Sequence, residues 1–265
     1  MVARNDYVMV IIAFVLRCKN YYFVCLRYYI AQIIVSQKQL ITIPRLDRIP
    51  FLYHGFGNAY WKEEDFARRE EGRDFKLLFL KQVHSNVVHV IDKVPEKDLE
   101  GDAMVTGLPR LFLIIKTADC LPILLVDEAK RVIAAVHCGW KGTLERALEK
   151  VVLGMKNHYG SDPRALLAAF GPCIGGGCYE VGEDVHRSFA AEEFSDSLFR
   201  PIPDRPGKHL LDLRKANRIQ LLGLGVREKN IFVVDICTHC DKNYLSYRRD
   251  KSKTGRMLSF IGMLE

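Results

Sequence analysis

The sequence lacks two features that would assign it to a common class of protein. It has no apolar run of about 20 residues, which is the length that a membrane-spanning helix needs. It also has no run rich in lysine and arginine and no regular alternation of basic and aromatic residues, so it does not predict a nucleic-acid-binding surface. We therefore expect no membrane span and no nucleic acid as a partner. We also expect the protein to be cytoplasmic and monomeric.

The composition is that of a soluble globular protein. Hydrophobic residues make up 49% and charged residues 27% of the 265 residues, which is ample material for a large core and excludes disorder. The chain has eight cysteines, but it is too long and too rich in core residues to need disulfides for stability. Reduced cysteines therefore suggest metal or thiol chemistry.

The first 39 residues differ from the rest of the chain. Of the net charge of +7, +4 is located here. Two short apolar stretches, the first spanning residues 7–16, are separated by Arg17-Cys18-Lys19-Asn20, where a signal peptide would have small residues at its cleavage site. We predict an N-terminal extension of doubtful function over residues 1–39, followed by a single catalytic domain over residues 40–265.

Short apolar runs between turn residues predict buried strands from residue 40 onward. The strands are expected at residues 76–83, 111–116, 121–126, 131–137, 166–170 and 230–235, with helices at 142–159 and 212–222. The short polar link between the third and fourth strands predicts a β-hairpin, and Gly160 is expected to end the first helix. Because strands and helices do not alternate steadily, we predict an α+β fold, a single domain of mixed β-sheets covered by helices in α/β/β/α-like layers.

Three metal-capable side chains stand at the ends of apolar runs: His84, Cys120 and His137. Two imidazoles and one thiolate suit zinc, and three protein ligands leave a coordination position open for chemistry. Adjacent side chains on a strand point to opposite faces, so Cys138 should face away from a metal that His137 binds. We expect about one zinc per chain, with Cys138 as a structural residue.

A second cysteine group allows two interpretations. Cys237 and Cys240 have C-x-x-C spacing, and Cys173 with Cys178 would complete a structural four-cysteine zinc site. Burial of these cysteines beside an active-site cavity is the simpler explanation of the pattern.

Six short blocks, in this order, resemble the YfiH-like family. They are Lys81-Gln82-Val83-His84-Ser85, Gly101 to Thr106, Thr117 to Pro122, His137 to Thr143, Gly171 to Ile174 and Ser246 to Asp250. The resemblance runs from about residue 50 to residue 262. The family has been labelled laccase-like polyphenol oxidase and is also described as purine nucleoside phosphorylase with adenosine deaminase activity.

The resemblance implies that His84, Cys120 and His137 bind the metal and form the catalytic centre, with zinc as the cofactor and copper possible. It implies phosphorolysis of adenosine, inosine and methylthioadenosine to free base and ribose 1-phosphate, with adenosine deamination, so the partners are a nucleoside and phosphate. Zinc lowers the pKa of a bound water toward about 7, which suits the deamination. The chain departs from the family in residues 54–60, which lack an arginine and a glycine pair, and at Lys141, which replaces an arginine.

Several basic residues, most of them near the C-terminus, lie in segments that resemble the family sequences, and they are candidates for phosphate binding. The substrate- and phosphate-binding candidates are Arg248, Arg249, Arg256 and Lys141. Asp119 and Glu180 are the candidates for the acid that protonates the departing base.

Three other functions stay open. Cys120 as a nucleophile, with His137 or His84 as its base, would give an amide hydrolase for peptidoglycan precursors, as some relatives are described as peptidoglycan editing factors. Copper-dependent phenol oxidation is expected as a side activity at most, because the chain has eight histidines and no His-x-His pair. A zinc-stabilised binding module would show no turnover.

Overall fold

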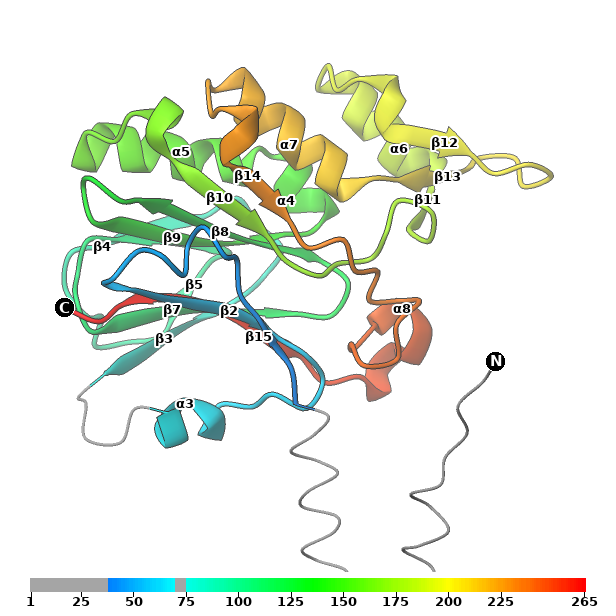
Figure 1. Cartoon of the computed structure of the whole chain (residues 1–265). Coiled ribbons are helices and arrows are strands. Elements are labelled where there is room, and N and C mark those ends of the chain that lie inside the picture. Colours follow the sequence, from blue (N-terminus) through cyan, green and yellow to red (C-terminus); the bar gives the residue numbers. More distant parts are fainter. Residues whose placement is uncertain (1–37, 70–74) are drawn as a thin grey trace, which may run out of the picture. The chain divides into compact units, whose positions relative to one another are not determined.

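The computed structural model describes residues 38–69 and 75–265. Leu40–Glu265 form one compact unit, shown in Figure 1. The two apolar stretches of the predicted extension lie outside the described residues. Within the described ranges, no helix combines the length and the apolar character needed to cross a membrane.

Two six-stranded sheets form the centre of the unit. The first has the order β1 (Leu40–Ile41), β2 (Leu52–Gly57), β15 (Met257–Met263), β7 (Leu111–Thr117), β3 (Lys76–Lys81), β5 (Leu99–Glu100). The second has the order β14 (Ile231–Val233), β10 (Leu167–Phe170), β8 (Leu121–Asp127), β9 (Val132–Cys138), β6 (Ala103–Thr106), β4 (Val88–Ile91). Each sheet mixes parallel and antiparallel pairs, as the parallel β3–β7 and the antiparallel β15–β7 pairs illustrate.

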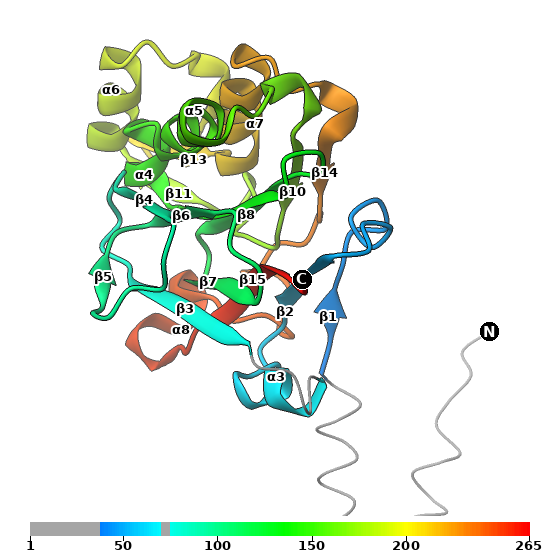
Figure 2. The same cartoon turned by 90° about the vertical axis from the view of Figure 1, so that its left-hand side faces the viewer.

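Several helices lie on the outer side of the second sheet, whereas the short helix Glu64–Arg69 lies on the outer side of the first (Figures 1 and 2). The helices are α3 (Glu64–Arg69), α4 (Trp140–Leu144), α5 (Ala147–Tyr159), α6 (Glu183–Ala191), α7 (Leu213–Gly223) and α8 (Tyr247–Asp250). Short 3-10 turns span Pro163–Ala165, Asp196–Leu198, Glu228–Asn230 and Lys251–Lys253. A small sheet of β11 (Glu180–Gly182), β13 (Lys208–Leu211) and β12 (Phe199–Pro201) lies beside α6. The predicted α+β class with mixed sheets covered by helices is confirmed.

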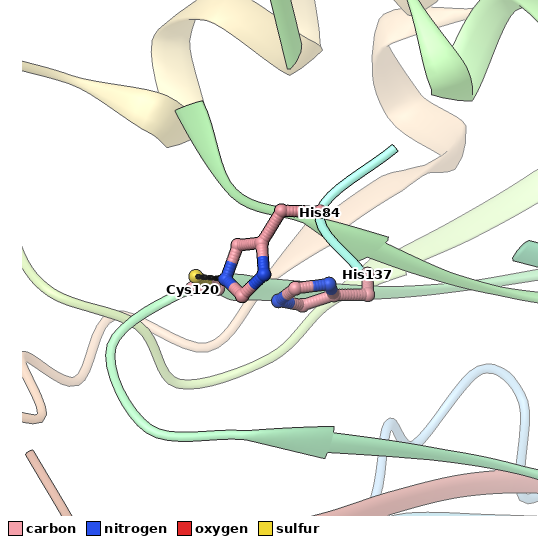
Figure 3. Close-up of side chains that lie close together, drawn as sticks. All are labelled: His84, Cys120 and His137. Carbon is pink, nitrogen blue, oxygen red and sulfur yellow. Dashed lines mark hydrogen bonds between the residues drawn. The ribbon is translucent and has the colours of Figure 1, made fainter. Parts of the chain in front are cut away.

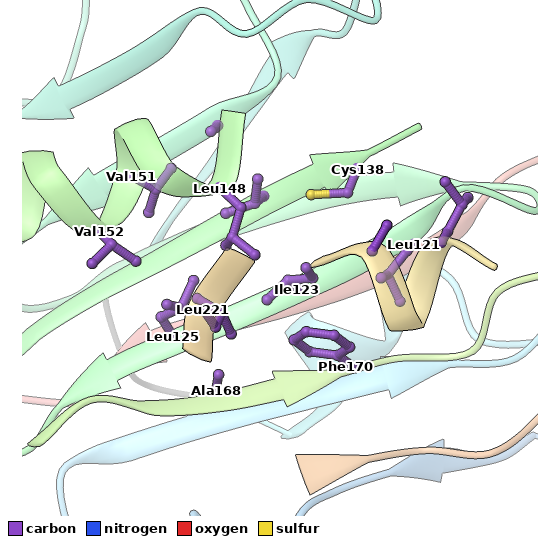
Figure 4. Close-up of a cluster of buried hydrophobic side chains, with 14 of the residues drawn as sticks. Leu121, Ile123, Leu125, Cys138, Leu148, Val151, Val152, Ala168, Phe170 and Leu221 are labelled. Atoms are coloured by element: carbon purple, nitrogen blue, oxygen red, sulfur yellow. The ribbon is translucent and has the colours of Figure 1, made fainter. Parts of the chain in front are cut away.

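The alternating side chains of β8 separate two cores. Ile123 and Leu125 pack with α5 and α7 residues on the outer face of the second sheet, as Figure 4 shows. Leu124 and Val126 point the other way, into the core between the two sheets. Because successive strand residues face opposite sides, one continuous apolar run supplies both cores.

The local predictions are largely confirmed, with one correction. The β8–β9 hairpin forms with Leu121 opposite Cys138, and Gly160 ends α5 in the left-handed conformation, with φ of 71°. The single helix expected over residues 142–159 is wrong, since the chain breaks it into α4 and α5. Arg146 stands at the break with φ of 59°, a left-handed conformation that no helix interior accepts.

Candidate active site

The three predicted ligands converge from three different segments. His84 follows the end of β3, Cys120 lies in the turn between β7 and β8, and His137 is on β9. Their ligand atoms all lie within 4.8 Å of one another. The Nε2 of His84 is 3.9 Å from the Sγ of Cys120, and the two imidazole rings meet edge to face at a centroid distance of 4.8 Å (Figure 3).

Asp102 accepts hydrogen bonds from both histidine ligands and thereby fixes their positions. Its side chain is fully buried and its Oδ1 accepts a hydrogen bond of 2.7 Å from Nδ1 of His137 and one of 3.1 Å from the backbone N–H of His84. Its Oδ2 accepts from the backbone N–H and the hydroxyl of Ser85, at 2.6 and 2.8 Å. One carboxylate therefore orients one imidazole and the backbone that carries the other.

The site favours a charged thiolate. Burial opposes ionisation of Cys120, but the neighbouring His137 and His84 outweigh it and lower the pKa of the Cys120 thiol to about 6. Burial likewise opposes charge on His137, yet Cys120 and Asp102 raise the pKa of His137 to about 9. Burial would raise the pKa of Asp102, but hydrogen bonds from His137 and Ser85 lower it to about 2. At neutral pH the group thus contains the thiolate that a metal requires.

The donor set fits a zinc ion. With Nδ1 of His137 bound to Asp102, its Nε2 is the nitrogen left for a metal, the arrangement in which a carboxylate fixes a ligating histidine. Tetrahedral zinc bonds place a sulfur and a nitrogen ligand about 3.6 Å apart, close to the 3.9 Å between Cys120 and His84.

Cys138 lies on the opposite face of β9 from His137, as its position in the strand predicts. It is fully buried in the core beneath α5 (Figure 4). Burial raises the pKa of the Cys138 thiol far above its usual range, so this cysteine is an uncharged core residue.

The ligand group opens into a pocket of about 670 Å³, within the usual range for small-molecule sites. It lies where strands of both sheets end against α8. Its walls are formed by Leu80, Gln82, His84, Lys116, Thr117, Ala118, Asp119, Cys120, His137, Trp140, Tyr179, Tyr247, Arg248 and Arg256.

The structure separates the predicted basic residues into two pairs. Arg248 and Arg256 line the pocket, whereas Arg249 and Lys141 do not belong to its lining in the described part of the chain. The guanidinium of Arg249 donates to the backbone oxygens of Thr238 and Tyr244, both at 2.8 Å. Lys141 lies over the ring of Trp140, with Nζ 5.7 Å from the centroid.

The two predicted acids are both engaged by other groups. Asp119 lines the pocket, but Oδ1 accepts from the hydroxyl of Thr238 at 2.7 Å and Oδ2 from the backbone N–H of Arg248 at 2.6 Å. Glu180 forms an ion pair with Arg205 and is outside the pocket lining, although its backbone oxygen accepts from Arg248 at 2.8 Å.

Sequence reasoning missed several residues of the pocket. Asp102 stands inside one of the six blocks that carry the resemblance, so a buried carboxylate next to a ligand histidine was a usable signal. Lys116, Trp140, Tyr179 and Tyr247 also line the pocket. Trp140 and Tyr247 stand inside two of the six blocks, whereas no local pattern distinguishes Lys116 and Tyr179 from other residues.

The family model described as multi-copper polyphenol oxidoreductase laccase matches residues 63–264, which is most of the chain. The chain belongs to this family, which is the YfiH-like family. The name purine nucleoside phosphorylase is carried by a relative from Deinococcus radiodurans that is 41% identical over 200 residues, covering 76% of this chain and 71% of the relative.

Other family members extend the match over more of the chain. The protein named purine nucleoside phosphorylase YfiH of Escherichia coli is 35% identical over 227 residues, covering 84% of this chain and 90% of that protein. The crystal structure of the hypothetical protein YfiH from Bacillus licheniformis superimposes with a TM-score of 0.77 at 26% identity, covering 84% of this chain and 96% of that one.

Proposed function

We propose that this chain is a zinc-dependent purine nucleoside phosphorylase that cleaves adenosine, inosine and methylthioadenosine, and that it also deaminates adenosine. One observation carries the proposal: a His-Cys-His group and the cations Lys116, Arg248 and Arg256 share a single nucleoside-sized pocket. The names of the relatives from Deinococcus radiodurans and Escherichia coli support the same activity.

His84, Cys120 and His137 would hold the zinc ion. Zinc bound there would supply Lewis acidity at an open coordination position. Asp102 is hydrogen-bonded to Nδ1 of His137, so Nε2 is the nitrogen that would bind the zinc. Copper is the alternative metal for the same donors.

The aromatic side chains and the cations of the pocket would bind different parts of the substrates. Trp140, Tyr179 and Tyr247 offer flat apolar surfaces against which a purine can stack. Arg248 is held by the backbone oxygen of Glu180 and by the ring of Tyr179, 5.3 Å from the guanidinium carbon. Its remaining N–H groups are therefore preorganised for an anion.

In phosphorolysis a phosphate oxygen forms a bond to C1′ of the ribose as the bond from C1′ to the purine nitrogen breaks, and the departing base takes up a proton. The contacts of Asp119 favour a positioning role for it, because both of its oxygens already accept hydrogen bonds and one of them comes from Arg248. In deamination, water adds at purine C6 and ammonia leaves.

The activity is tested by incubating zinc-loaded protein with adenosine, with phosphate or with an equal concentration of sulfate. We expect adenine and ribose 1-phosphate only where phosphate is present, and inosine in both reactions. Chromatographic separation of adenine, inosine and hypoxanthine measures both activities. If zinc-loaded protein leaves adenosine intact in both reactions, the proposal is wrong.

Arg256→Ala should raise the KM for phosphate about 10- to 100-fold, because a hydrogen bond to a charged group contributes about 1.5–3 kcal/mol. Steady-state kinetics at varied phosphate concentration measure it. Arg187→Ala is the matched control, since Arg187 pairs with Glu183 on the exposed face of α6, outside the pocket. An unchanged KM in the Arg256 variant would place the phosphate elsewhere.

A second candidate function rests on the Cys120, His137 and Asp102 arrangement. A thiolate beside an imidazole that a carboxylate orients is also the geometry of a cysteine nucleophile with its base. An amide hydrolase of peptidoglycan precursors would retain activity after removal of the metal by a chelator, whereas the proposed phosphorylase would lose it.

A further inference from the structure

A second group of metal-capable side chains comes from two loops near the pocket. Cys178 belongs to the loop between β10 and β11, while Cys237, His239 and Cys240 follow β14. The Sγ atoms of Cys178 and Cys240 are 3.3 Å apart. The ligand atoms of Cys178, His239 and Cys240 lie within 4.8 Å of one another.

Cys237 joins this group through the turn of the C-x-x-C segment. The backbone N–H groups of Cys240 and Asp241 donate to the backbone oxygen of Cys237, at 3.2 and 3.0 Å, which folds the segment back on itself. The backbone N–H of Gly175 donates to the Sγ of Cys237 at 3.2 Å, and the backbone oxygen of Gly175 accepts from the N–H of Cys178 at 2.8 Å, so Cys237 adjoins the loop that carries Cys178. Such an N–H donor stabilises a thiolate, the form of cysteine that binds a metal.

Cys173, which the spacing had placed in a four-cysteine site, is not part of the group. It is completely buried, and its Sγ lies 3.5 Å from the backbone oxygen of Ile174. Cys173 and Cys237 are neighbours through an isolated parallel backbone bridge. The imidazole of His239 instead stands beside the thiols of Cys178 and Cys240.

We propose that Cys178, Cys237, His239 and Cys240 bind a second zinc ion, distinct from that of the pocket. Three thiolates and one imidazole are a complete tetrahedral ligand set, so this ion is structural and leaves no open position. Thiolate-rich sites select zinc over harder cations such as magnesium. Cys240 is exposed and Cys178 is partly exposed, so zinc reaches the group without unfolding of the core.

The ion would join two loops that build the active pocket. Thr238, between two of the proposed ligands, donates to Asp119 in the pocket wall at 2.7 Å. Tyr179 follows Cys178 directly and lines the pocket. Arg249 donates to the backbone oxygens of Thr238 and His239, at 2.8 and 3.1 Å. A metal cross-link here would hold in place the part of the pocket wall that contains Asp119 and Tyr179.

The proposal raises the expected zinc content from one to two ions per chain. The test is elemental analysis of full-length protein purified in reductant, comparing wild type with the double variant Cys178→Ser/Cys240→Ser and with Cys120→Ala. We expect two zinc ions per chain in the wild type, and one in both the double variant and Cys120→Ala. Cys173→Ala is the matched control from the same loops and should keep two.

A second measurement needs no substitution. In native wild-type protein Cys178, Cys237 and Cys240 should resist alkylation, and a chelator should make all three reactive, as mapped by mass spectrometry. A wild-type content of one zinc that the double variant retains in full would overturn the proposal. So would a disulfide between Cys178 and Cys240 in protein that was kept reduced.

Discussion

Cys120→Ala should lose one zinc per chain and reduce nucleoside turnover by several orders of magnitude, as removal of a central catalytic group does in other enzymes. The thiolate of Cys120 is the only anionic donor of the pocket group, which otherwise consists of the imidazoles of His84 and His137. Without it two neutral ligands remain, too few for a stable zinc site. Elemental analysis and the adenosine assay measure the two losses.

Cys138→Ala is the control, because Cys138 is one residue from His137 and points into the core. It should keep the zinc of the pocket and most of the turnover, with a modest loss of stability of about 1 kcal/mol from a small core truncation. If Cys120→Ala and Cys138→Ala lost zinc and turnover equally, the prediction that only Cys120 faces the metal site would be wrong. Stoichiometric copper in protein expressed without added copper would contradict zinc as the metal.

Asp102→Asn should weaken zinc binding by about 10- to 100-fold, the usual effect of removing the partner of a ligating histidine. The carboxylate accepts N–H donors on both oxygens, from His137 and His84 on one and from Ser85 and Val83 on the other. In the asparagine variant, the side-chain NH₂ group would replace one of these oxygens and face N–H donors instead of accepting from them. Facing His137, it would move the imidazole proton to Nε2 and so block the metal-binding nitrogen.

Competition with a chromophoric chelator measures this affinity, and thermal unfolding reports stability separately. Asp127→Asn is the matched control, since Asp127 is also a buried carboxylate and accepts from the backbone N–H groups of Ala129 and Lys130 in the β8–β9 turn. The control should lose stability but keep its zinc affinity. Wild-type zinc affinity in the Asp102 variant would show that its role is only structural.

The strands were predictable because their apolar runs are buried on both faces. The run 121–126 corresponds to β8, which contributes to two cores. The break between α4 and α5 was not predictable from periodicity, since Leu144, Ala147 and Leu148 keep helical spacing across it. The left-handed Arg146 at the break pairs with Glu149 and donates to the backbone oxygen of Glu192, a residue distant in the sequence.

The sequence by itself determined which residue types could hold a metal and that His137 and Cys138 face opposite sides, because strand alternation is a local property of the backbone. The roles of residues 1–39, the monomeric state and the location in the cell stay predictions. Only the tertiary structure decided that Arg248 and Arg256, but not Arg249, line the pocket, and that His239 rather than Cys173 lies beside Cys178 and Cys240. These choices depend on contacts between segments tens of residues apart, and such contacts follow from how the sheets and loops pack rather than from any local spacing.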